Sequence, residues 1–149
     1  MMRYRVIMQL HQDFSRIHYT VRAYAPGRVT VVTPRADGST AQRRPPRQEE
    51  ILTRSVVIMP STLIRDWPPQ HSSEVSATHF EPIAALQPEL VLFGSGRRVK
   101  FPDPRVLKPL KDRGIGVEVM DTGAACRTYN ILVAEGRLVA AALLMIDMD

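Results

Sequence analysis

Residues 114–132 read GIGVEVMDTGAACRTYNIL, a succession that predicts a buried strand, a tight turn and the start of a helix. Val117, Val119 and Met120 are the apolar residues that predict the strand. Asp121 or Thr122 can cap the helix that follows, and we expect this helix to run to Glu135. Polar side chains therefore gather where a strand meets a helix, which is the usual location of a site in an α/β sheet.

The sequence around this stretch extends the pattern to β-α-β-α-β. Residues 90–93 are a continuous apolar run, as in strands buried on both faces of a parallel sheet, and residues 138–144 are a second such run. Short helices are expected over 79–86, where apolar residues recur at helical spacing, and over 104–112, which a proline can open. Connections this short imply right-handed crossovers and mainly parallel pairing.

The first half of the chain predicts antiparallel strands instead. Residues 17–24 alternate and carry β-branched and aromatic side chains, and residues 29–33 follow a turn at 25–28, so the two strands make a hairpin. A third strand is expected over 52–59. The sequence therefore predicts a single layered α/β domain over residues 1–149, with an N-terminal β-meander and a central mixed, mostly parallel sheet flanked by helices.

Two segments depart from this regular pattern. Residues 1–14 look like a loose leader, and residues 34–50 are a basic loop, rich in Pro, Arg, Gly and Gln, that we expect to be exposed and mobile. The densest basic cluster lies at 43–47, and it fits either a solvated loop or a loop that contacts anions. No aromatic residue is interleaved with this cluster, which argues against stacking on single-stranded nucleic acid.

Composition narrows the class of protein. A chain of 149 residues with 44% apolar content fits one globular domain, and its net charge of +5 is scattered over the predicted elements. The single cysteine, Cys126, excludes an intrachain disulfide and favours a reducing compartment. No apolar run approaches the roughly 20 residues that span a bilayer, and Gln9 and His11 interrupt the apolar patch of the leader. A cytoplasmic location is therefore expected.

One crevice emerges as the candidate site. The loops after consecutive parallel strands share one edge of a sheet, so residues 94–96 and 121–123 should face each other. A helix that begins there directs free N–H groups and a positive dipole end into the crevice, where an anion can bind. The candidate residues are Gly94, Ser95, Gly96, Asp121, Thr122, Gly123, Cys126, Arg127, Tyr129 and Asn130. The loop lacks the third glycine of a dinucleotide site and the lysine of a P-loop, so no cofactor is predicted.

Each reactive side chain in this set has an ordinary structural interpretation as well. Cys126 lies near a helix N-terminus, which lowers the pKa of a nucleophile, but a cysteine among small residues is often simply packed. Tyr129 and Asn130 fit a pocket lining or a tie between the helix and neighbouring backbone.

Outside the crevice, Trp67 precedes two prolines and is expected to plug the core. No metal site is predicted, because ligand spacing is missing among His11, His18, His71 and His79.

Several of these residues together resemble a known family of small α/β domains. It is a domain-of-unknown-function family of bacteria and archaea, which also includes a mitochondrial respiratory complex I assembly factor and an adipogenesis-associated protein. The resemblance rests on residues 67–68, 88–96, 101–102, 116–130 and 135–137. Ser95 stands where many members carry Thr, and the insertion at 40–48 is longer and more basic than in the family.

The resemblance implies one layered α/β domain with no established enzymatic activity and no known cofactor. For the mitochondrial relatives it implies protein binding during assembly of a membrane complex at the inner-membrane surface. We therefore expect a non-catalytic protein-interaction or assembly factor with a protein partner, and peripheral membrane association is a further expectation. Two alternatives stay open: an enzyme or small-ligand binder that uses the crevice, and weak nucleic-acid binding through the arginine-rich loop.

Overall fold

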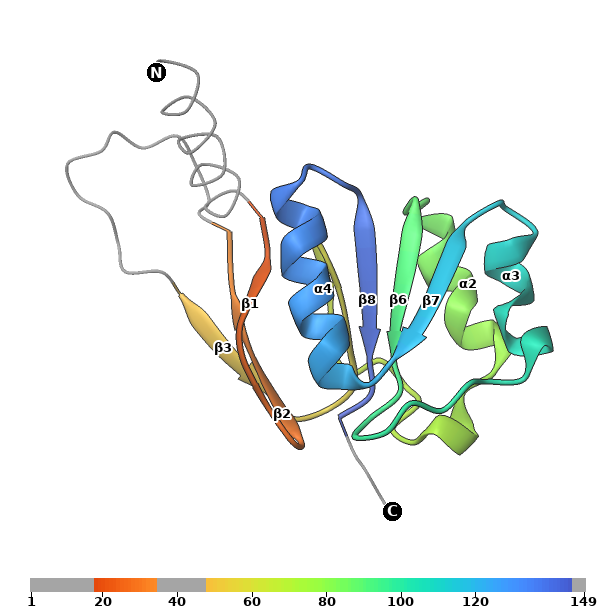
Figure 1. Ribbon diagram of the computed structural model, residues 1–149, viewed down its shortest axis with the longest axis horizontal. Helices are drawn as coiled ribbons and strands as arrows, with labels where there is room; N and C mark the ends of the chain where they lie inside the picture. The colour runs from red at the N-terminus through yellow and green to blue at the C-terminus, as the bar shows by residue number, and fades with distance from the viewer. Residues whose placement is uncertain (1–17, 35–47, 146–149) are drawn as a thin grey trace.

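Two β-sheets and three α-helices make up the part of the chain that the computed structural model describes, residues 18–34 and 48–145 (Figure 1). The smaller sheet is an antiparallel meander in the order β1-β2-β3. Its strands are β1 (Thr20–Ala25), β2 (Arg28–Val32) and β3 (Glu49–Leu52). The predicted hairpin and meander are therefore confirmed.

The larger sheet has five strands in the order β5-β4-β8-β6-β7. Strand β6 pairs in parallel with β7 and β8, whereas β4 pairs antiparallel with β8 and β5, so the sheet is mixed as expected. The β-α-β-α-β half supplies its three parallel strands. The five strands are β4 (Val56–Met59), β5 (Thr62–Ile64), β6 (Leu90–Gly94), β7 (Gly116–Met120) and β8 (Val139–Leu143).

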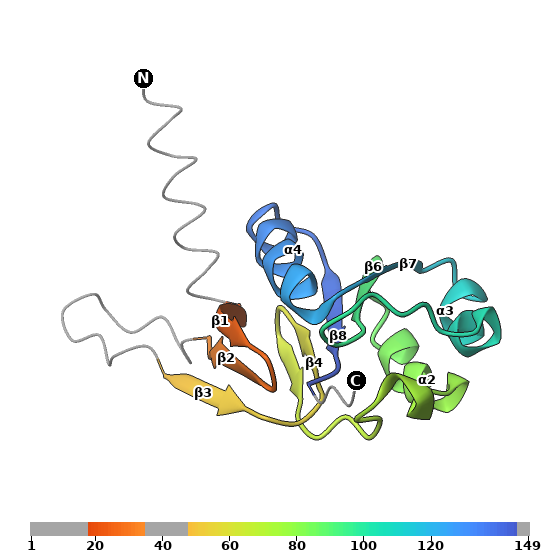
Figure 2. The same ribbon diagram turned by 60° about the horizontal axis from the view of Figure 1, so that its bottom comes forward.

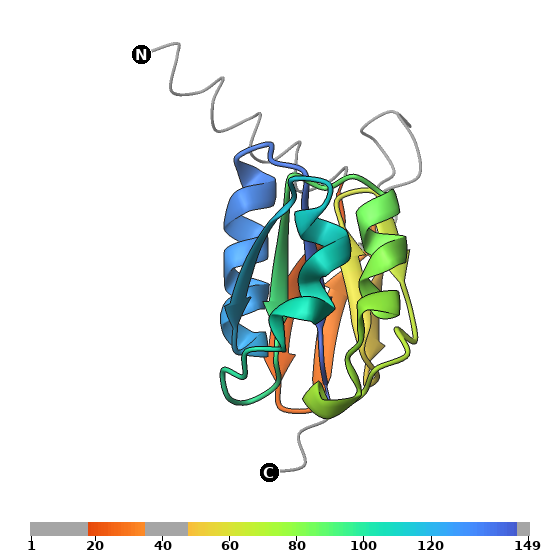
Figure 3. The ribbon, with the colours of Figure 1, turned by 90° about the vertical axis from the view of Figure 1, so that its right-hand side faces the viewer.

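Helices cover both faces of the five-stranded sheet. Helix α4 and the three-stranded sheet share one face, and α2 and α3 lie on the other (Figure 2), which Figure 3 shows from the side of α2 and α3. None of the helices in the described ranges has both the length and the apolar character needed to cross a membrane. The helical segments are η1 (Ser72–Glu74), α2 (Ala77–Ala85), η2 (Pro104–Leu107), α3 (Lys108–Lys111) and α4 (Thr122–Ala134).

The core consists of two layers, one on each side of the five-stranded sheet. Successive side chains of a strand point to opposite faces, so Leu92 faces α4 while Phe93 faces α2. The layer beneath α4 also contains Val29 and Val31 of β2, so the meander and the larger sheet share one core, as predicted. Trp67 plugs the other layer, where its ring lies 5.6 Å from that of Phe80.

The predicted strand over 52–59 is wrong as a single element. Residues 53–55 interrupt it, because the Ser55 backbone accepts a hydrogen bond from the Trp67 N–H and donates one to the Gln70 side chain. The chain thereby passes from the three-stranded sheet into the five-stranded sheet. Glu49 and Glu50, which we assigned to the basic loop, belong to β3.

Two further elements differ from their predictions. Strand β7 is not buried but lies at the edge of the larger sheet, with each of its residues exposed or half-buried. The helix predicted over 104–112 is a 3₁₀ turn followed by one α-helical turn, and Gly114 ends it with a φ of 69°. The predictions of a leader at 1–14 and of a mobile loop, for its residues 35–47, lie outside the described residues.

Candidate functional site

The two loops predicted to share a crevice are bonded to each other. The Gly96 N–H donates to Thr122 Oγ1 at 2.8 Å, and the Thr122 N–H donates to the Gly96 carbonyl at 2.8 Å. Thr122 Oγ1 also donates to the Leu144 carbonyl at 2.8 Å, and the residue is fully buried. One threonine hydroxyl therefore joins the loop after β6, the start of α4 and the end of β8.

Ser95 shapes the loop that follows β6. Its N–H donates to the Met120 carbonyl of β7 at 2.9 Å. Its hydroxyl donates to the Arg98 carbonyl at 2.6 Å and accepts from the Lys100 N–H at 2.9 Å. The serine thus uses its hydrogen bonds within the chain, and they fix the path of residues 95–100.

Glycine at position 94 permits the close approach of α4 to the sheet. A Cβ atom on Gly94 would lie 3.0 Å from the Thr122 Cα and 3.0 Å from Leu143 Cδ2. Gly123 faces the Tyr24 ring, and a Cβ there would lie 3.1 Å from the ring. Both glycines are therefore explained by packing of the α4 N-terminus.

Asp121 is the N-cap of α4, as the sequence predicted. Its Oδ1 accepts a hydrogen bond from the Ala124 N–H at 2.8 Å, which satisfies one of the free donors of the first turn. Arg127 lies on the exposed face of the same helix. The Asp121 side chain therefore closes the start of the helix, whereas Arg127 is exposed on its surface.

Cys126 is packed in the core and is 3% exposed. Burial raises the pKa of its thiol to about 12, and this effect exceeds the opposing effect of the Arg127 charge. The thiol is therefore protonated at neutral pH, whereas a nucleophilic cysteine reacts as the thiolate. Its surroundings match the interpretation as a structural residue.

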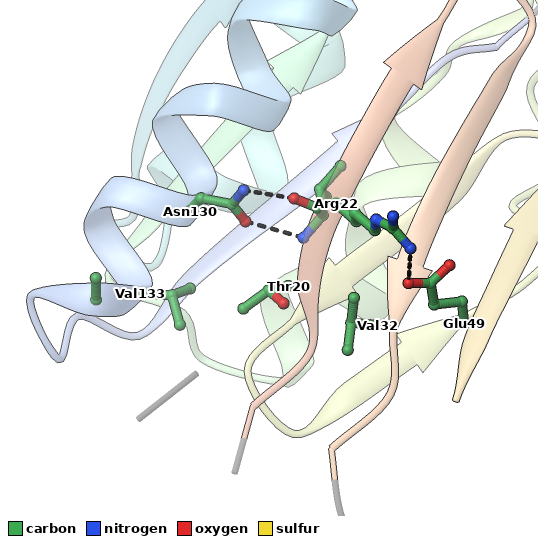
Figure 4. A pocket seen from close by; sticks show the side chains of 8 residues that line it. Thr20, Arg22, Val32, Glu49, Asn130 and Val133 are labelled. Carbon is green, nitrogen blue, oxygen red and sulfur yellow. Dashed lines mark hydrogen bonds and ion pairs between the residues drawn. The ribbon is translucent and has the colours of Figure 1, made fainter. Parts of the chain in front are cut away.

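Tyr129 and Asn130 tie α4 to β1. The Tyr129 hydroxyl donates to the Tyr19 carbonyl at 2.8 Å, and burial raises the pKa of this phenol. The Asn130 side chain donates through Nδ2 to the Val21 carbonyl at 2.6 Å and accepts through Oδ1 from the Val21 N–H at 2.9 Å (Figure 4). Of the two interpretations left open for this pair, Tyr129 therefore fits the tie to neighbouring backbone, and Asn130 fits both, because it also lines a cavity.

A cavity of about 440 Å³ lies beside this tie, between α4 and the three-stranded sheet. The side chains of Val32 and Val133 give it apolar walls, while Arg22 and Glu49 form an ion pair across the strands (Figure 4). Its lining residues are Thr20, Val21, Arg22, Val32, Glu49, Asn130, Val133 and Ala134. We call this the α4–β1 cavity. It is large enough for a small ligand or for a side chain of a partner.

Sequence analysis found one lining residue of this cavity, Asn130, and missed the rest. Helical spacing could have added Val133 and Ala134, which lie three and four positions further along α4. The residues of β1 and β2 had no such signal, because 109 positions separate Val21 from Asn130.

Among the described residues, no three His, Cys, Asp or Glu side chains lie close enough together to hold a metal ion.

These features define a class of small α/β domain in which one capped helix joins an antiparallel meander to a mixed sheet. A family model described as "Protein of unknown function (DUF498/DUF598)" matches residues 21–144, so the chain belongs to this family. The family resemblance inferred from the sequence is therefore confirmed.

Relatives with known names and structures support this assignment. The chain is 37% identical over 90 residues to the mouse (Mus musculus) protein named NADH dehydrogenase (ubiquinone) 1 alpha subcomplex assembly factor 3, which covers 59% of this chain. The match spans 48% of the mouse protein, about half its length. A crystal structure from Bordetella parapertussis is 35% identical, with a TM-score of 0.70 over 89% of this chain and 99% of that one. A solution structure from Xanthomonas campestris is 33% identical, with a TM-score of 0.68 over 88% and 87%.

Proposed function

We propose that this protein is a non-catalytic factor that binds a protein partner and assists the assembly of a respiratory membrane complex. The observation that carries the proposal is the similarity to the mouse assembly factor, 37% identity over 90 residues. The chemistry of the predicted crevice argues against nucleophilic catalysis there, because Cys126 is held as a thiol and the Ser95 and Thr122 hydroxyls are bonded to backbone. The cytoplasmic location expected from the sequence is part of this proposal.

The partner would dock on the α4–β1 cavity and on the helix surface beside it. Ile131 is 58% exposed, and it neighbours Asn130 in sequence and Ala134 one helical turn on. An apolar side chain of the partner would enter the cavity, while Ile131 would pack against its flank. The Arg22–Glu49 pair at the cavity would fix orientation through polar contacts. Such a buried apolar anchor within a polar rim is the common anatomy of a protein interface.

The proposal is tested by affinity capture from native extract that includes solubilised membranes, followed by mass spectrometry. We expect subunits of a respiratory complex to be recovered with the tagged protein. Two variants should lose them: Ile131→Asp, which charges the exposed flank, and Ala134→Phe, which fills the cavity. Leu86→Asp is the matched control, because Leu86 is also an exposed apolar residue but ends α2 on the opposite face.

Two results would sink this proposal. The first is recovery of no respiratory subunit by the unaltered protein at moderate salt. The second is equal recovery by Ile131→Asp, Ala134→Phe and Leu86→Asp, since the partner would then bind elsewhere. Circular dichroism and thermal unfolding of each variant establish that a loss of capture reflects the surface and not the fold.

A second candidate function is small-molecule binding, and the size of the α4–β1 cavity favours it. Ligand pockets commonly enclose about 300–1,000 Å³ with apolar walls and a few convergent polar groups. Thermal-shift screening would detect such a ligand, and Ala134→Phe should abolish the shift. The other site alternative, an anion-binding enzyme in the crevice of residues 94–96 and 121–130, has less support because its polar groups are occupied. Nucleic-acid binding through the arginine-rich loop depends on residues outside the described ranges.

A further inference from the structure

Strand β7 is hydrogen-bonded along one side and open along the other. It lies at the edge of the five-stranded sheet, where it pairs with β6. The N–H and C=O of one strand residue point to the same side, and those of the next residue point to the other side. The Met120 carbonyl accepts from the Ser95 N–H at 2.9 Å, so Met120 and Glu118 face β6. Val117 and Val119 therefore turn their backbone groups outward, where the described part of the chain supplies no hydrogen-bond partner.

The open edge has the character of a strand that pairs. Figure 3 shows β7 between α4 and α3. Val117 and Val119 are β-branched residues, which favour strands, and their side chains are anchored against the core layer beneath α2. Glu118 between them is exposed and forms no ion pair with any residue that the structure describes. Because unpaired backbone groups at a sheet edge are a template for another strand, β7 can accept one.

The sequence of β7 limits how it could pair with itself. Two copies related by a two-fold axis pair antiparallel, and the axis passes through one central residue. A register centred on Glu118 sets two carboxylates directly opposite each other, which destabilises the pair. A register centred on Val117 pairs Val119 with Ile115, whose N–H is already bonded to the Leu110 carbonyl at 2.9 Å. The register centred on Val119 avoids both faults.

We propose that β7 pairs antiparallel with β7 of a second copy of this chain, centred on Val119. The two Val119 residues exchange both of their backbone hydrogen bonds, and each Val117 does the same with Asp121 of the other copy. Asp121 suits this role, because its backbone is extended, with φ −64° and ψ 158°. Its N–H has no backbone partner among the described residues. The five-stranded sheets of the two copies then form one continuous sheet.

Charge complementarity favours a second copy as the occupant. In this register Glu118 lies opposite Met120 of the second copy. Arg98 lies beside Met120, because the Ser95 hydroxyl donates to the Arg98 carbonyl at 2.6 Å and lies 3.3 Å from the Met120 carbonyl oxygen. Arg98 is exposed and forms no ion pair within the described ranges. Glu118 of each copy therefore meets Arg98 of the other, so the two-fold axis supplies both members of two ion pairs.

Exposed apolar side chains adjoin the same end of the strand. Val99 is 48% exposed and Phe101 is 77% exposed. The Lys100 N–H between them donates to the Ser95 hydroxyl at 2.9 Å, which holds this loop at the carboxyl end of β7. In the proposed register, the amino end of the second strand, with its exposed Gly116, lies next to this loop. Burial of these apolar side chains would stabilise the pairing of the two copies.

This pairing leaves the α4–β1 cavity open. Figure 1 shows β1 and β7 on opposite sides of the molecule, with α4 and the central strands between them. A second copy at β7 and a protein partner at the cavity can therefore be bound at the same time. The inference does not depend on the proposed function, because it concerns the purified chain alone.

Sedimentation velocity of the purified full chain, from low to high micromolar concentration, tests the inference. We expect the mass to rise with concentration from that of one chain to that of two. Val119→Pro removes the central N–H donor of each copy, and the fold should tolerate proline there because this N–H faces away from β6. The variant should raise the dissociation constant of the dimer about tenfold, since two hydrogen bonds are lost.

A charge exchange tests the register. Glu118→Arg and Arg98→Glu each set like charges together and should raise the dissociation constant about tenfold. The double variant restores opposite charges and should return it to within about threefold of the unaltered protein. Glu135→Arg is the matched control, because it changes the net charge equally at an exposed position where α4 ends. This control should stay within about twofold.

Amide hydrogen exchange measured by NMR gives a second readout. The Val117 and Val119 amides should exchange more slowly as the concentration rises, whereas the amides of β5, at the other edge of the same sheet, should not change. Ile131→Asp should dimerise normally, which separates this result from the capture test. Circular dichroism and thermal unfolding establish that each variant is folded.

Three results would overturn the inference. The first is a monomer at every concentration. The second is a dimer whose affinity survives Val119→Pro, or in which the double charge variant recovers none of the affinity lost by the single variants. The third is protection of the β7 amides only when another protein is added, since the edge would then accept a strand of that protein.

Discussion

The side-chain amide of Asn130 pairs with the backbone of Val21 as a neighbouring strand would, donating to its carbonyl at 2.6 Å and accepting from its N–H at 2.9 Å. Strand β1 is an edge strand of the meander, and its pairing with β2 shifts register between Val21 and Ala23. An edge strand leaves N–H and C=O groups unpaired. Asn130 satisfies one such pair and thereby fixes α4 on the meander.

Replacement of this amide should therefore destabilise the fold. We expect Asn130→Ala to lower the free energy of unfolding by about 1–3 kcal/mol, because two partly buried backbone groups lose their partners. Urea denaturation followed by circular dichroism measures the change. Arg127→Ala, on the exposed face of the same helix, is the control and should stay within about 0.5 kcal/mol. Equal effects of the two variants would show that the Asn130–Val21 pair contributes nothing specific.

Thr122 should be needed for its hydroxyl and not for its shape. Thr122→Val keeps the volume but removes the group that joins Gly96 to Leu144, and we expect a loss of about 1–3 kcal/mol in the free energy of unfolding. Thr122→Ser retains the hydroxyl and should recover much of this loss. If the serine variant is as unstable as the valine variant, the methyl group matters more than the two hydrogen bonds.

The second half of the fold was predictable because its signals are local. Strands β6 and β8 are buried on both faces, and a continuous apolar run reports this directly. Asp121 caps a backbone group three residues away, so its role could be predicted as well. The β7 strand was misassigned because VEVM carries apolar side chains although it lies at an edge of the sheet.

The features that escaped prediction depend on contacts between distant residues. The break at 53–55 is set by Trp67 and Gln70, which bond to Ser55 across 12 and 15 positions. The role of Thr122 depends on Gly96 and Leu144, 26 and 22 positions away. Residue types alone favoured an open polar crevice there, because they do not tell whether a hydroxyl faces solvent or a backbone carbonyl.

Ser55 presents the opposite case to Thr122. It is fully buried, and its hydroxyl has no hydrogen-bond partner among the described residues, although its backbone is bonded on both sides. A buried polar group without a partner costs about 1–3 kcal/mol. We therefore expect Ser55→Ala to leave the free energy of unfolding unchanged or to raise it by about 1 kcal/mol. A loss of more than 1 kcal/mol in urea denaturation would show that the hydroxyl has a partner in solution.

Gly94 should tolerate no side chain. An added methyl group would lie 3.0 Å from the backbone of Thr122, which cannot move without displacing the start of α4. We expect Gly94→Ala to lower the free energy of unfolding by about 1–3 kcal/mol. Gly116→Ala is the matched control, because the atom it meets at 3.3 Å is the end of the flexible Leu90 side chain. A larger loss from Gly116→Ala than from Gly94→Ala would contradict the close packing of α4 on β6.

Cys126 should make the protein sensitive to alkaline pH. Burial raises the pKa of its thiol from 9.0 to about 12, so above pH 9 the unfolded thiol ionises while the folded thiol stays protonated. The unfolded state then binds fewer protons than the folded state, and the free energy of unfolding falls as the pH rises from about 9 towards 12. Tyr129, whose pKa burial also raises, adds a fall that begins near its ordinary value of 10. Cys126→Ala removes the contribution of the thiol, so the stability of this variant should decline less than that of the unaltered protein between pH 9 and pH 10.

The burial of Cys126 also predicts that a disulfide reagent modifies its thiol far more slowly in the folded protein than in urea. Fast modification of the folded protein at neutral pH would instead indicate an accessible thiolate and would restore Cys126 as a candidate nucleophile.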